Sequence, residues 1–432
     1  MKDKLPKILI VFTILYLENF LEFVSTGMIY FPIAAGISLN IRDILILGFI
    51  AYYIFSKKKD RVSPQLKLLL IYLAFCLFAI TLMSIFAYGA TPGAIGRRLS
   101  QYMSYVLIVG LVMLVDGNKH LRFFIGVIFV VGLLSCFIHF MEFAQGSYFS
   151  LPLFDVSNKY FTGEPGSVEG LIRIWNRASS TTMIMFLLSA VFLTSNIPHR
   201  KFFIIPFIIS LASIALAMVR TLYVFAACTL VSVFIVNLLR KEGKPFLLGV
   251  ILSIIAILSP VYIFKKHPEM FAVIERFQTI YSQGFEAQTM TSRQRQIEFF
   301  KNKMLEADIP PVFGLGITNE SAKYKSTDLG FMNIIINMGL LGIFFIFCVF
   351  IYLYQKSRYV MLKSPDDLGR AIGSAVFCML PGLFIIGINF DYITYTHFTK
   401  LLLPVVLLEA AWFLTDHQSV NMQTSFSRNY KV

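Results

Sequence analysis

The 432-residue sequence is poor in charge: Asp, Glu, Lys and Arg together make up 14% of it, whereas hydrophobic residues make up 57%. A soluble globular domain carries about 25% charged residues, so this composition excludes one. Apolar runs of roughly 20 residues, the length that crosses a bilayer as a helix, recur from one end of the chain to the other. The composition therefore predicts a polytopic membrane protein.

The signatures of several enzyme classes are also missing. There is no HExxH, GxSxG, Walker or GxGxxG pattern, and no acidic cluster that would hold a divalent metal. The five cysteines all fall inside apolar runs, which is typical of small core residues and not of a disulfide framework or a metal cluster. We therefore expect no metal and no cofactor.

Acidic residues are outnumbered by basic ones, 24 against 38, for a formal charge of +14. In a membrane protein an excess of Lys and Arg marks the cytoplasmic connections, which explains the charge more simply than nucleic-acid binding does. With the N-terminus in the cytoplasm, every predicted inner connection carries Lys or Arg, whereas the short outer ones carry few. We therefore expect both termini in the cytoplasm.

An all-α fold with about twelve transmembrane helices is predicted. The first apolar run lacks a small-residue cleavage site and continues into further spans, so we expect it to remain as a helix. It is long, and Pro32 is a potential breakpoint within it. The predicted spans are 7–35, 41–56, 67–87, 99–115, 121–142, 177–195, 202–217, 220–239, 246–264, 328–354, 368–387 and 397–414.

Two of the predicted outer connections, 143–176 and 265–327, are long enough to fold. Bulky apolar residues in the second recur at helical spacing, which predicts an amphipathic helix on the membrane surface or on the bundle. They are Phe271, Ile274, Phe277 and Tyr281.

A second helix in the later loop is predicted to begin at Thr291, because Thr291 and Gln294 have the spacing of a capping box. Arg293 and Arg295 fall in its first turn. The free backbone N–H groups of a helix N-terminus attract phosphate, and arginine can bind phosphate oxygens through two parallel hydrogen bonds. Both arginines are therefore candidates for binding a phosphorylated substrate; an exposed basic turn is the alternative.

Arg220 is the single charge in the apolar run 202–239. This run is too long for one span and long enough for two, so the chain is expected to turn near Met218–Arg220 on the outer side. An arginine there could reach the lipid headgroups, but the positive-inside rule disfavours basic residues in a short outer turn. We therefore expect Arg220 to have a functional role.

Further arginines lie at the predicted outer boundary. Some of them are expected to be headgroup anchors, and one has a neighbouring aspartate with which it could pair. Together they make an outer face rich in arginine at lipid depth, which suits a dianion or a pyrophosphate better than a nucleic acid. These residues are Arg42 (beside Asp43), Arg97, Arg98, Arg173 and Arg177.

Candidate proton acceptors are predicted on the same side. Asp328 ends the long loop and opens the next span, where an N-cap role alone would also explain it. His139 lies on an apolar helix, which favours a core histidine. The segment NFDYITYTHFTK contains Asp391, Tyr395 and His397 and has the polar-aromatic composition of a glycan-contacting loop, although an interfacial aromatic belt has the same composition.

Three stretches of the chain resemble the O-antigen ligase and Wzy-type polysaccharide polymerase family of bacterial membrane glycosyltransferases. The family's Ser/Thr–Arg pair that opens a span is similar to LAMVRTLYVFAAC, which contains Arg220. Its loop pattern of an arginine, a helix, a Pro and a Gly-x-Gly is similar to SRQRQIEFFKNKMLEADIPPVFGLGI, which transfers to Arg293 or Arg295. Its next motif is similar in spacing to DLGFMNIIINMGLLGIF, with Phe331, Gly339 and Gly342.

The third motif departs from the family pattern. The family's frequent His is Asp328 here, its Asn is Leu329, and its acidic residue is Asn337. An aspartate at the His position is associated more with polymerases than with ligases, so the resemblance favours a polymerase.

The resemblance implies a GT-C-like fold in the bacterial inner membrane and a metal-independent reaction at the outer leaflet. The implied donor is a glycan on undecaprenyl pyrophosphate; the implied acceptor is a sugar hydroxyl of another lipid-linked repeat. Membrane lipids and a chain-length regulator are further expected partners.

The implied reaction assigns roles to the candidate residues. Arg220 and Arg293 would hold the pyrophosphate charge, and Asp328 would act as the base or position the acceptor; His139 or His397 are alternative bases, and the reaction could also need no strong base. Secondary candidates for binding pyrophosphate or glycan are Arg295, Arg173, Arg98, Arg97, His397 and Tyr395. Two other functions remain open: an O-antigen ligase that transfers glycan to lipid A-core, and a polysaccharide flippase or other transporter.

Overall fold

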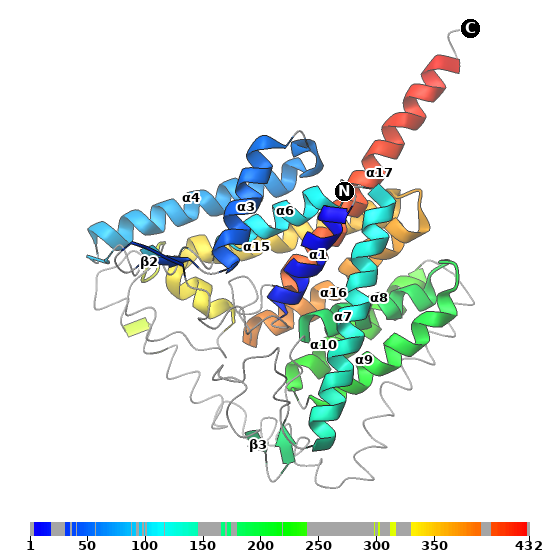
Figure 1. Cartoon of the computed structure of the whole chain (residues 1–432), viewed down its shortest axis with the longest axis horizontal. Coiled ribbons are helices and arrows are strands. Elements are labelled where there is room, and N and C mark those ends of the chain that lie inside the picture. The colour runs from blue at the N-terminus through cyan, green and yellow to red at the C-terminus, as the bar shows by residue number, and fades with distance from the viewer. Residues whose placement is uncertain are drawn as a thin grey trace.

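The computed structural model of the chain is predominantly helical (Figure 1). It describes residues 4–18, 31–34, 37–39, 41–56, 58–87, 89–91, 95–96, 99, 102–115, 117–145, 166–168, 171–173, 179–217, 219–239, 298, 301–302, 312–316, 330–389 and 399–429. The longer helices are α1 (Lys4–Leu17), α3 (Ile41–Phe55), α4 (Pro64–Phe86), α6 (Tyr105–Leu114), α7 (Gly117–Gln145), α8 (Ser179–Thr194), α9 (Ile204–Leu216), α10 (Arg220–Leu239), α15 (Phe331–Lys363), α16 (Asp367–Asn389) and α17 (Thr399–Asn429).

Short elements complete the described part. Two one-turn 3-10 helices, η1 (Lys59–Arg61) and η2 (Arg200–Phe203), precede α4 and α9. Two antiparallel hairpins pair β1 (Phe31–Ala34) with β2 (Ile37–Leu39) and β3 (Gly166–Val168) with β4 (Leu171–Arg173). Each strand has only three or four residues, so the helices determine the architecture.

Within the described residues, five helices are long and apolar enough to cross a membrane: Pro64–Phe86, Gly117–Gln145, Thr221–Leu238, Phe331–Lys363 and Asp367–Ile388. In α4 both faces are apolar. One face packs inside the protein, whereas the opposite face exposes Leu68, Ile71, Phe75 and Phe78 by 58–68%. Because an apolar helix surface of this kind needs an apolar solvent, the exposed face suits lipid. The chain is therefore an α-helical membrane protein.

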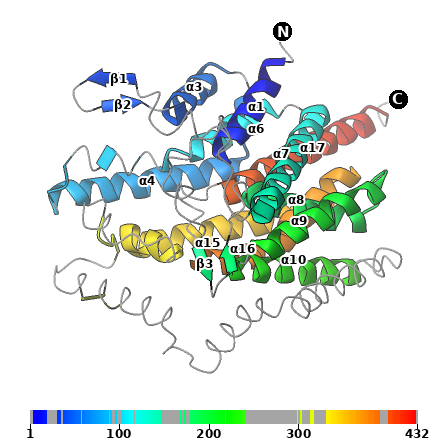
Figure 2. The same cartoon turned by 60° about the horizontal axis from the view of Figure 1, so that its bottom comes forward.

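Two helices lie in the middle of the bundle. Every residue of α8 from Ser180 onward is buried, and so is every residue of α17 from Lys400 to Ala411. Helix α8 packs against α7, α9, α16 and α17 (Figure 2). A helix that is buried on all sides has no lipid-facing stripe, so polar groups on α8 and the first turns of α17 must find partners inside the protein.

Most of the predicted spans have helical counterparts, and the bounds predicted for 220–239 match α10. One prediction is wrong: 7–35 is not a single helix. Helix α1 ends at Leu17, and residues 31–34 form strand β1, which pairs with β2. Pro32, the potential breakpoint named from the sequence, lies in β1; it removes a backbone donor and disfavours a helix interior.

Other predictions differ in extent. Helix α15 continues nine residues beyond the predicted end at 354, and α17 continues 15 residues beyond 414. Part of the predicted outer loop 143–176 forms the β3–β4 hairpin. The predicted span 246–264, the amphipathic helix at 271–281 and the capping box at Thr291 lie outside the described residues, although residues 298 and 301–302 beyond that box are helical.

Candidate functional site

Buried polar side chains of α7, α8, α9 and α17 meet at one end of the bundle. His139 Nδ1 lies 2.9 Å from Ser213 Oγ, joining the last turns of α7 and α9. Cys136 Sγ lies 3.7 Å from Thr182 Oγ1, joining α7 to the first turn of α8. These contacts place the ends of α7 and α9 beside the start of α8.

Helix α17 begins at the same place. Lys400 is its second residue, and the Lys400 ammonium donates to Ser180 Oγ at the start of α8 over 3.3 Å. We call this the Lys400 end of the bundle. Lys400 is only 3% exposed and is attracted electrostatically by Glu18, which follows α1 and is also 3% exposed. The end of α1 therefore lies there too.

Helix α15 begins at the Lys400 end as well. Its first turn folds back along the helix, because the Phe331 ring centroid lies 6.0 Å from that of Phe350 on α15 and 6.0 Å from that of Phe384 on α16. The first residues of α15 pack on the last turns of α16: a Cβ added to Gly387 would overlap the Phe331 ring. Helix α16 therefore ends where α15 begins.

Asp328 itself lies outside the described residues, but Gly330, two residues later, is described. Gly330, with φ +40°, precedes α15 and sits against the backbone of Gly387 and Ile388. Asp328 precedes Gly330 by two residues in the sequence, a chain length of at most about 7 Å.

Arg220 is the first residue of α10, and its backbone lies at the same end. Helix α10 packs along α16, where a Cβ on Gly382 would come to 2.5 Å from Phe225 Cδ2. Arg220 precedes Phe225 by five residues and Gly387 follows Gly382 by five, about 7.5 Å along each helix. Because α10 starts and α16 ends at the Lys400 end, Arg220 is level with Gly387 and close to the region that contains Asp328.

The end of the predicted outer-loop motif, residues 312–316, contacts the first turns of helix α15. Helix α15 is interrupted at Gly339, whose φ of 58° and ψ of −139° are accessible essentially to glycine alone. The break frees carbonyl groups of the preceding turn, and Leu315 N–H donates to Ile336 O over 2.7 Å. Leu341 N–H donates to Val312 O over 3.3 Å on the other side of the break. The 312–316 turn thus fills the break and satisfies backbone groups that lipid could not.

Glycine is required for this approach. Gly314 has φ +63°, and a Cβ there would lie 2.5 Å from Ile336 O and 2.6 Å from Gly339 N. The Gly-x-Gly stretch that starts at Gly314 and the Gly-x-x-Gly stretch that starts at Gly339, both quoted above for their resemblance to a known family, are therefore in direct backbone contact. The large loop that carries Arg293 and Arg295 is connected to the bundle through this turn.

The remaining candidates are placed only through their neighbours in the chain. Arg173 ends strand β4, six residues before α8. Arg177 and His397 each lie three residues before the bonded pair Ser180 and Lys400, at most about 11 Å of chain from it. The side chains of Arg173 and Arg220 and all of Arg97, Arg98, Arg293, Arg295, Tyr395 and His397 lie outside the described residues.

His139 is a core residue, as its apolar surroundings predict. It is 1% exposed, and its ring is held by the Ser213 hydroxyl. Asn337, at the position of the family's acidic residue, donates its amide to Asn333 O over 2.7 Å. It therefore supports the turn before the Gly339 break.

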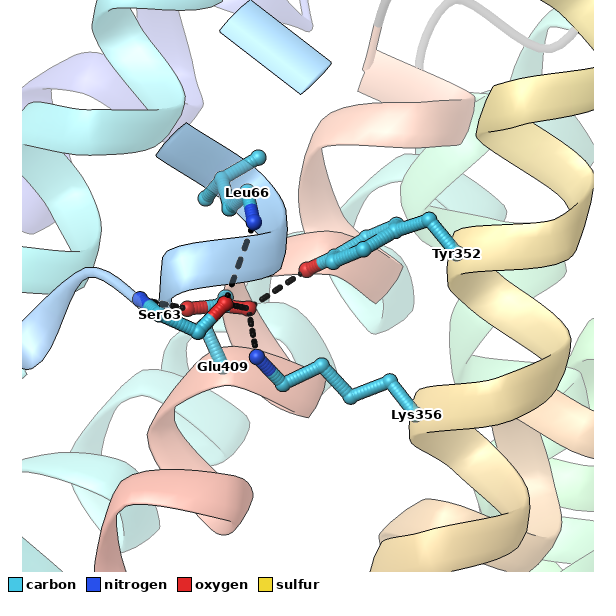
Figure 3. A network of polar contacts seen from close by, with 5 residues as sticks. All are labelled: Ser63, Leu66, Tyr352, Lys356 and Glu409. Carbon is cyan, nitrogen blue, oxygen red and sulfur yellow. Dashed lines mark hydrogen bonds and ion pairs between the residues drawn. The ribbon is translucent and has the colours of Figure 1, made fainter. Parts of the chain in front are cut away.

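A second buried polar cluster lies farther along α17 (Figure 3). The Glu409 carboxylate accepts from Ser63 N–H at 2.9 Å, Ser63 Oγ at 2.7 Å and Tyr352 OH at 2.6 Å, and it is ion-paired with Lys356. Lys356 Nζ also lies 4.0 Å from the centroid of the Trp412 ring. Both oxygens of this fully buried carboxylate accept hydrogen bonds, three at Oε1 and one at Oε2, so the cluster ties α4, α15 and α17 together.

The sequence reasoning missed Glu18, Lys400, Lys356 and Glu409. The available signal was an ionisable residue inside a predicted span, since such residues are rare in membrane helices and are usually paired or functional. Glu18, Lys400 and Glu409 each fall within a predicted span.

Comparison with known proteins finds no matching family model and no matching curated relative. Among the described residues, no group of three or more His, Cys, Asp or Glu side chains is arranged to hold a metal ion.

Proposed function

We propose that the protein is a polysaccharide polymerase of the bacterial inner membrane. It would transfer a glycan from undecaprenyl pyrophosphate to a sugar hydroxyl of a second lipid-linked repeat at the outer leaflet. The hydroxyl oxygen forms a bond to the anomeric carbon while the bond from that carbon to the pyrophosphate oxygen breaks. The hydroxyl proton passes to a base, and undecaprenyl pyrophosphate leaves with its charge.

One observation carries the proposal: described segments within or beside three candidate stretches that are far apart in the sequence meet around the first turns of α15 and the end of α16. Arg220 starts α10 level with Gly387, Gly330 next to Asp328 packs on Gly387, and the 312–316 turn of the arginine-bearing loop fills the break in α15. Lipid-linked glycan transfer needs a cation for the leaving group and a proton acceptor at lipid depth. The meeting of these segments supports Arg220 as that cation and Asp328 as that acceptor.

In this scheme Arg220 and Arg293 bind the pyrophosphate and stabilise the charge that develops on it. Asp328 accepts the proton of the acceptor hydroxyl or positions that hydroxyl. Removal of one such donor to a developing anion costs about 3–4 kcal/mol of transition-state stabilisation, roughly a hundredfold to a thousandfold in rate.

The membrane arrangement belongs to the same proposal. Twelve spans in a GT-C-like fold with both termini in the cytoplasm would place the Lys400 end at the outer leaflet. In Figure 1 the start of α1 and the far end of α17 lie on the upper side, whereas the β3–β4 hairpin lies on the lower side. The excess of Lys and Arg in the connections on the terminal side supports that side as cytoplasmic.

The test is a gel profile of surface glycan from a deletion strain complemented with wild type, Arg220→Ala or Asp328→Ala. We expect core plus one repeat unit from the deletion strain and from both variants, and a full ladder from wild type. Arg370→Ala is the matched control, because Arg370 is half exposed and pairs with its helix neighbour Asp367. Each variant is also quantified in the membrane fraction.

Other band patterns on the gel would contradict the polymerase and indicate a different function. Loss of the single-repeat band, with polymer retained on the lipid carrier, would assign a ligase. Accumulation of unpolymerised repeats on the cytoplasmic side would assign a flippase. Normal ladders from both variants would remove Arg220 and Asp328 from the site.

A further inference from the structure

A buried lysine lies between the starts of two fully buried helices. The Lys400 ammonium contacts Ser180 Oγ, and Glu18 is the described group whose charge acts on it. A charge buried in a membrane bundle is unfavourable unless it is paired or has a function. Glu18 and Lys400 lie at the end of the bundle where the proposed reaction takes place, so a functional role for these two charges has to be considered.

The surroundings of Lys400 favour an anion. Helices α8 and α17 both begin here, and each contributes free backbone N–H groups and roughly half a positive charge at its N-terminus. Lys400 adds a full positive charge. Glu18 is a described carboxylate whose charge acts on Lys400, and Glu142 in the last turn of α7 is a second buried carboxylate at this end, so an anion bound here has to displace the Glu18 carboxylate from Lys400.

A polar group beside Ser180 points to a ligand as well. Thr181, in the first turn of α8, is fully buried, and among the described residues its hydroxyl has no hydrogen-bond partner. A buried hydroxyl without a partner is unfavourable. An oxyanion bound beside Lys400 would give that hydroxyl an acceptor.

We propose that Lys400, Ser180 and Thr181 form a phosphate-binding site for the lipid-linked pyrophosphate, with Glu18 as the counter-ion of Lys400 when the site is empty. The site deepens the polymerase function proposed above and rests on it. On binding, a phosphate oxygen takes the place of the Glu18 carboxylate beside the Lys400 ammonium and accepts from the two hydroxyls.

Removing the Lys400 charge and removing the Glu18 charge should change the affinity for pyrophosphate in opposite directions. This difference distinguishes a role in binding from a purely structural role. Lys400→Met should weaken binding of a short-chain prenyl pyrophosphate about tenfold to a hundredfold, the effect of losing a charged hydrogen bond. Glu18→Gln should tighten binding, because the carboxylate no longer competes with the phosphate. Ser180→Ala with Thr181→Val should weaken it without changing any charge. If Lys400 only held the helices together, Glu18→Gln and Lys400→Met would change affinity in the same direction or not at all.

The experiment measures the dissociation constant of a fluorescent prenyl pyrophosphate for the full-length protein in phosphatidylcholine nanodiscs, with a thermal unfolding curve for each variant. Lys201→Met, at an exposed lysine of η2, is the matched control and should bind like wild type. If Lys400→Met does not fold, the Glu18→Gln and Ser180→Ala/Thr181→Val proteins still decide the question.

Competition identifies the source of the phosphate. Displacement by unlabelled prenyl pyrophosphate but not by phosphatidylglycerol supports the proposal; equal displacement by both would make this a lipid-headgroup site and overturn it. Unchanged binding in the Lys400, Glu18 and Ser180/Thr181 variants would overturn the phosphate site and leave the polymerase function standing. Absence of wild-type binding together with normal surface glycan in the deletion strain would reject both.

Discussion

Ser63 and Glu409 are 346 residues apart in the sequence, yet the backbone N–H and the hydroxyl of Ser63 both donate to the Glu409 carboxylate. Ser63 is also the N-cap of α4, since its Oγ accepts from Leu66 N–H at 3.2 Å. One carboxylate thus fixes the start of α4 against the middle of α17. Lys356 and Tyr352 add α15 to the same connection.

Removing one member of this cluster should be strongly destabilising. Glu409→Ala leaves the Lys356 ammonium buried without its ion-pair partner, and breaking a buried pair in this way costs about 3–5 kcal/mol. We expect a lower unfolding temperature and less monodisperse protein in detergent, as measured by size-exclusion chromatography after a heating series. The double variant Lys356→Met/Glu409→Leu should recover much of the loss, because no unpaired charge remains.

The exposed pair of Asp367 and Arg370 is the control for this prediction. Asp367→Asn should change stability by no more than about 1 kcal/mol, because exposed pairs contribute little. A Glu409→Ala protein as stable as Asp367→Asn would contradict a structural role for the cluster.

The contact between the 312–316 turn and the break in α15 predicts that Gly314→Ala abolishes polymer formation. The added Cβ would meet backbone atoms of Ile336 and Gly339, which cannot move aside as a flexible side chain could. The turn would be pushed out of the break in α15, and with it the chain segment that follows Arg293 and Arg295 in the sequence. Glycan gels and membrane-fraction immunoblots measure the result.

Gly89→Ala is the matched control for Gly314→Ala. Gly89 has a similar φ of +57° but nothing within 4 Å of the position of a Cβ. It should therefore show only the cost of the left-handed backbone, about 1–2 kcal/mol, and retain polymer. Equal loss in both variants would mean that backbone strain and not the contact is responsible.

The sequence predicted the features that depend on local pattern. The length of the run 202–239 was enough to divide it into two helices, and α10 begins at Arg220, where the turn was expected to end. The first predicted span failed because hydropathy does not distinguish the β1 strand around Pro32 from a continued helix. Local sequence pattern therefore predicts the positions of most helices along the chain, and the prediction is least reliable where a proline changes the backbone conformation.

Long-range partners could not be predicted in this way. Gly314 and Gly339 were recognised as parts of motifs, but the insertion of one beside the other depends on the three-dimensional arrangement of loop and helix. The same is true of Lys400 and Glu18, which come from opposite ends of the chain. A charged residue in a predicted span signals that a partner exists without identifying it.

The core position of His139 predicts that it is not the catalytic base. His139→Gln can still hydrogen-bond to Ser213 Oγ, so we expect near-normal glycan ladders from this variant, whereas Asp328→Asn should give only single repeats. His139→Ala should lower the unfolding temperature because the Ser213 hydroxyl loses its buried partner. Loss of polymer in a stable His139→Gln protein would assign the base to His139.

The packing of Phe331 on Gly387 predicts a loss of activity that a second substitution restores. A Cβ at Gly387 would overlap the Phe331 ring, so Gly387→Ala should push the start of α15 away from α16 and move Asp328 with it. We expect shorter or absent glycan ladders from Gly387→Ala at normal protein levels, and recovery in Gly387→Ala/Phe331→Leu, whose smaller side chain leaves room for the methyl group. Gly126→Ala, at a helix position with nothing within 4 Å, should behave like wild type. Failure of the second substitution to restore the ladder would show that Gly387 acts in another way than by placing the start of α15.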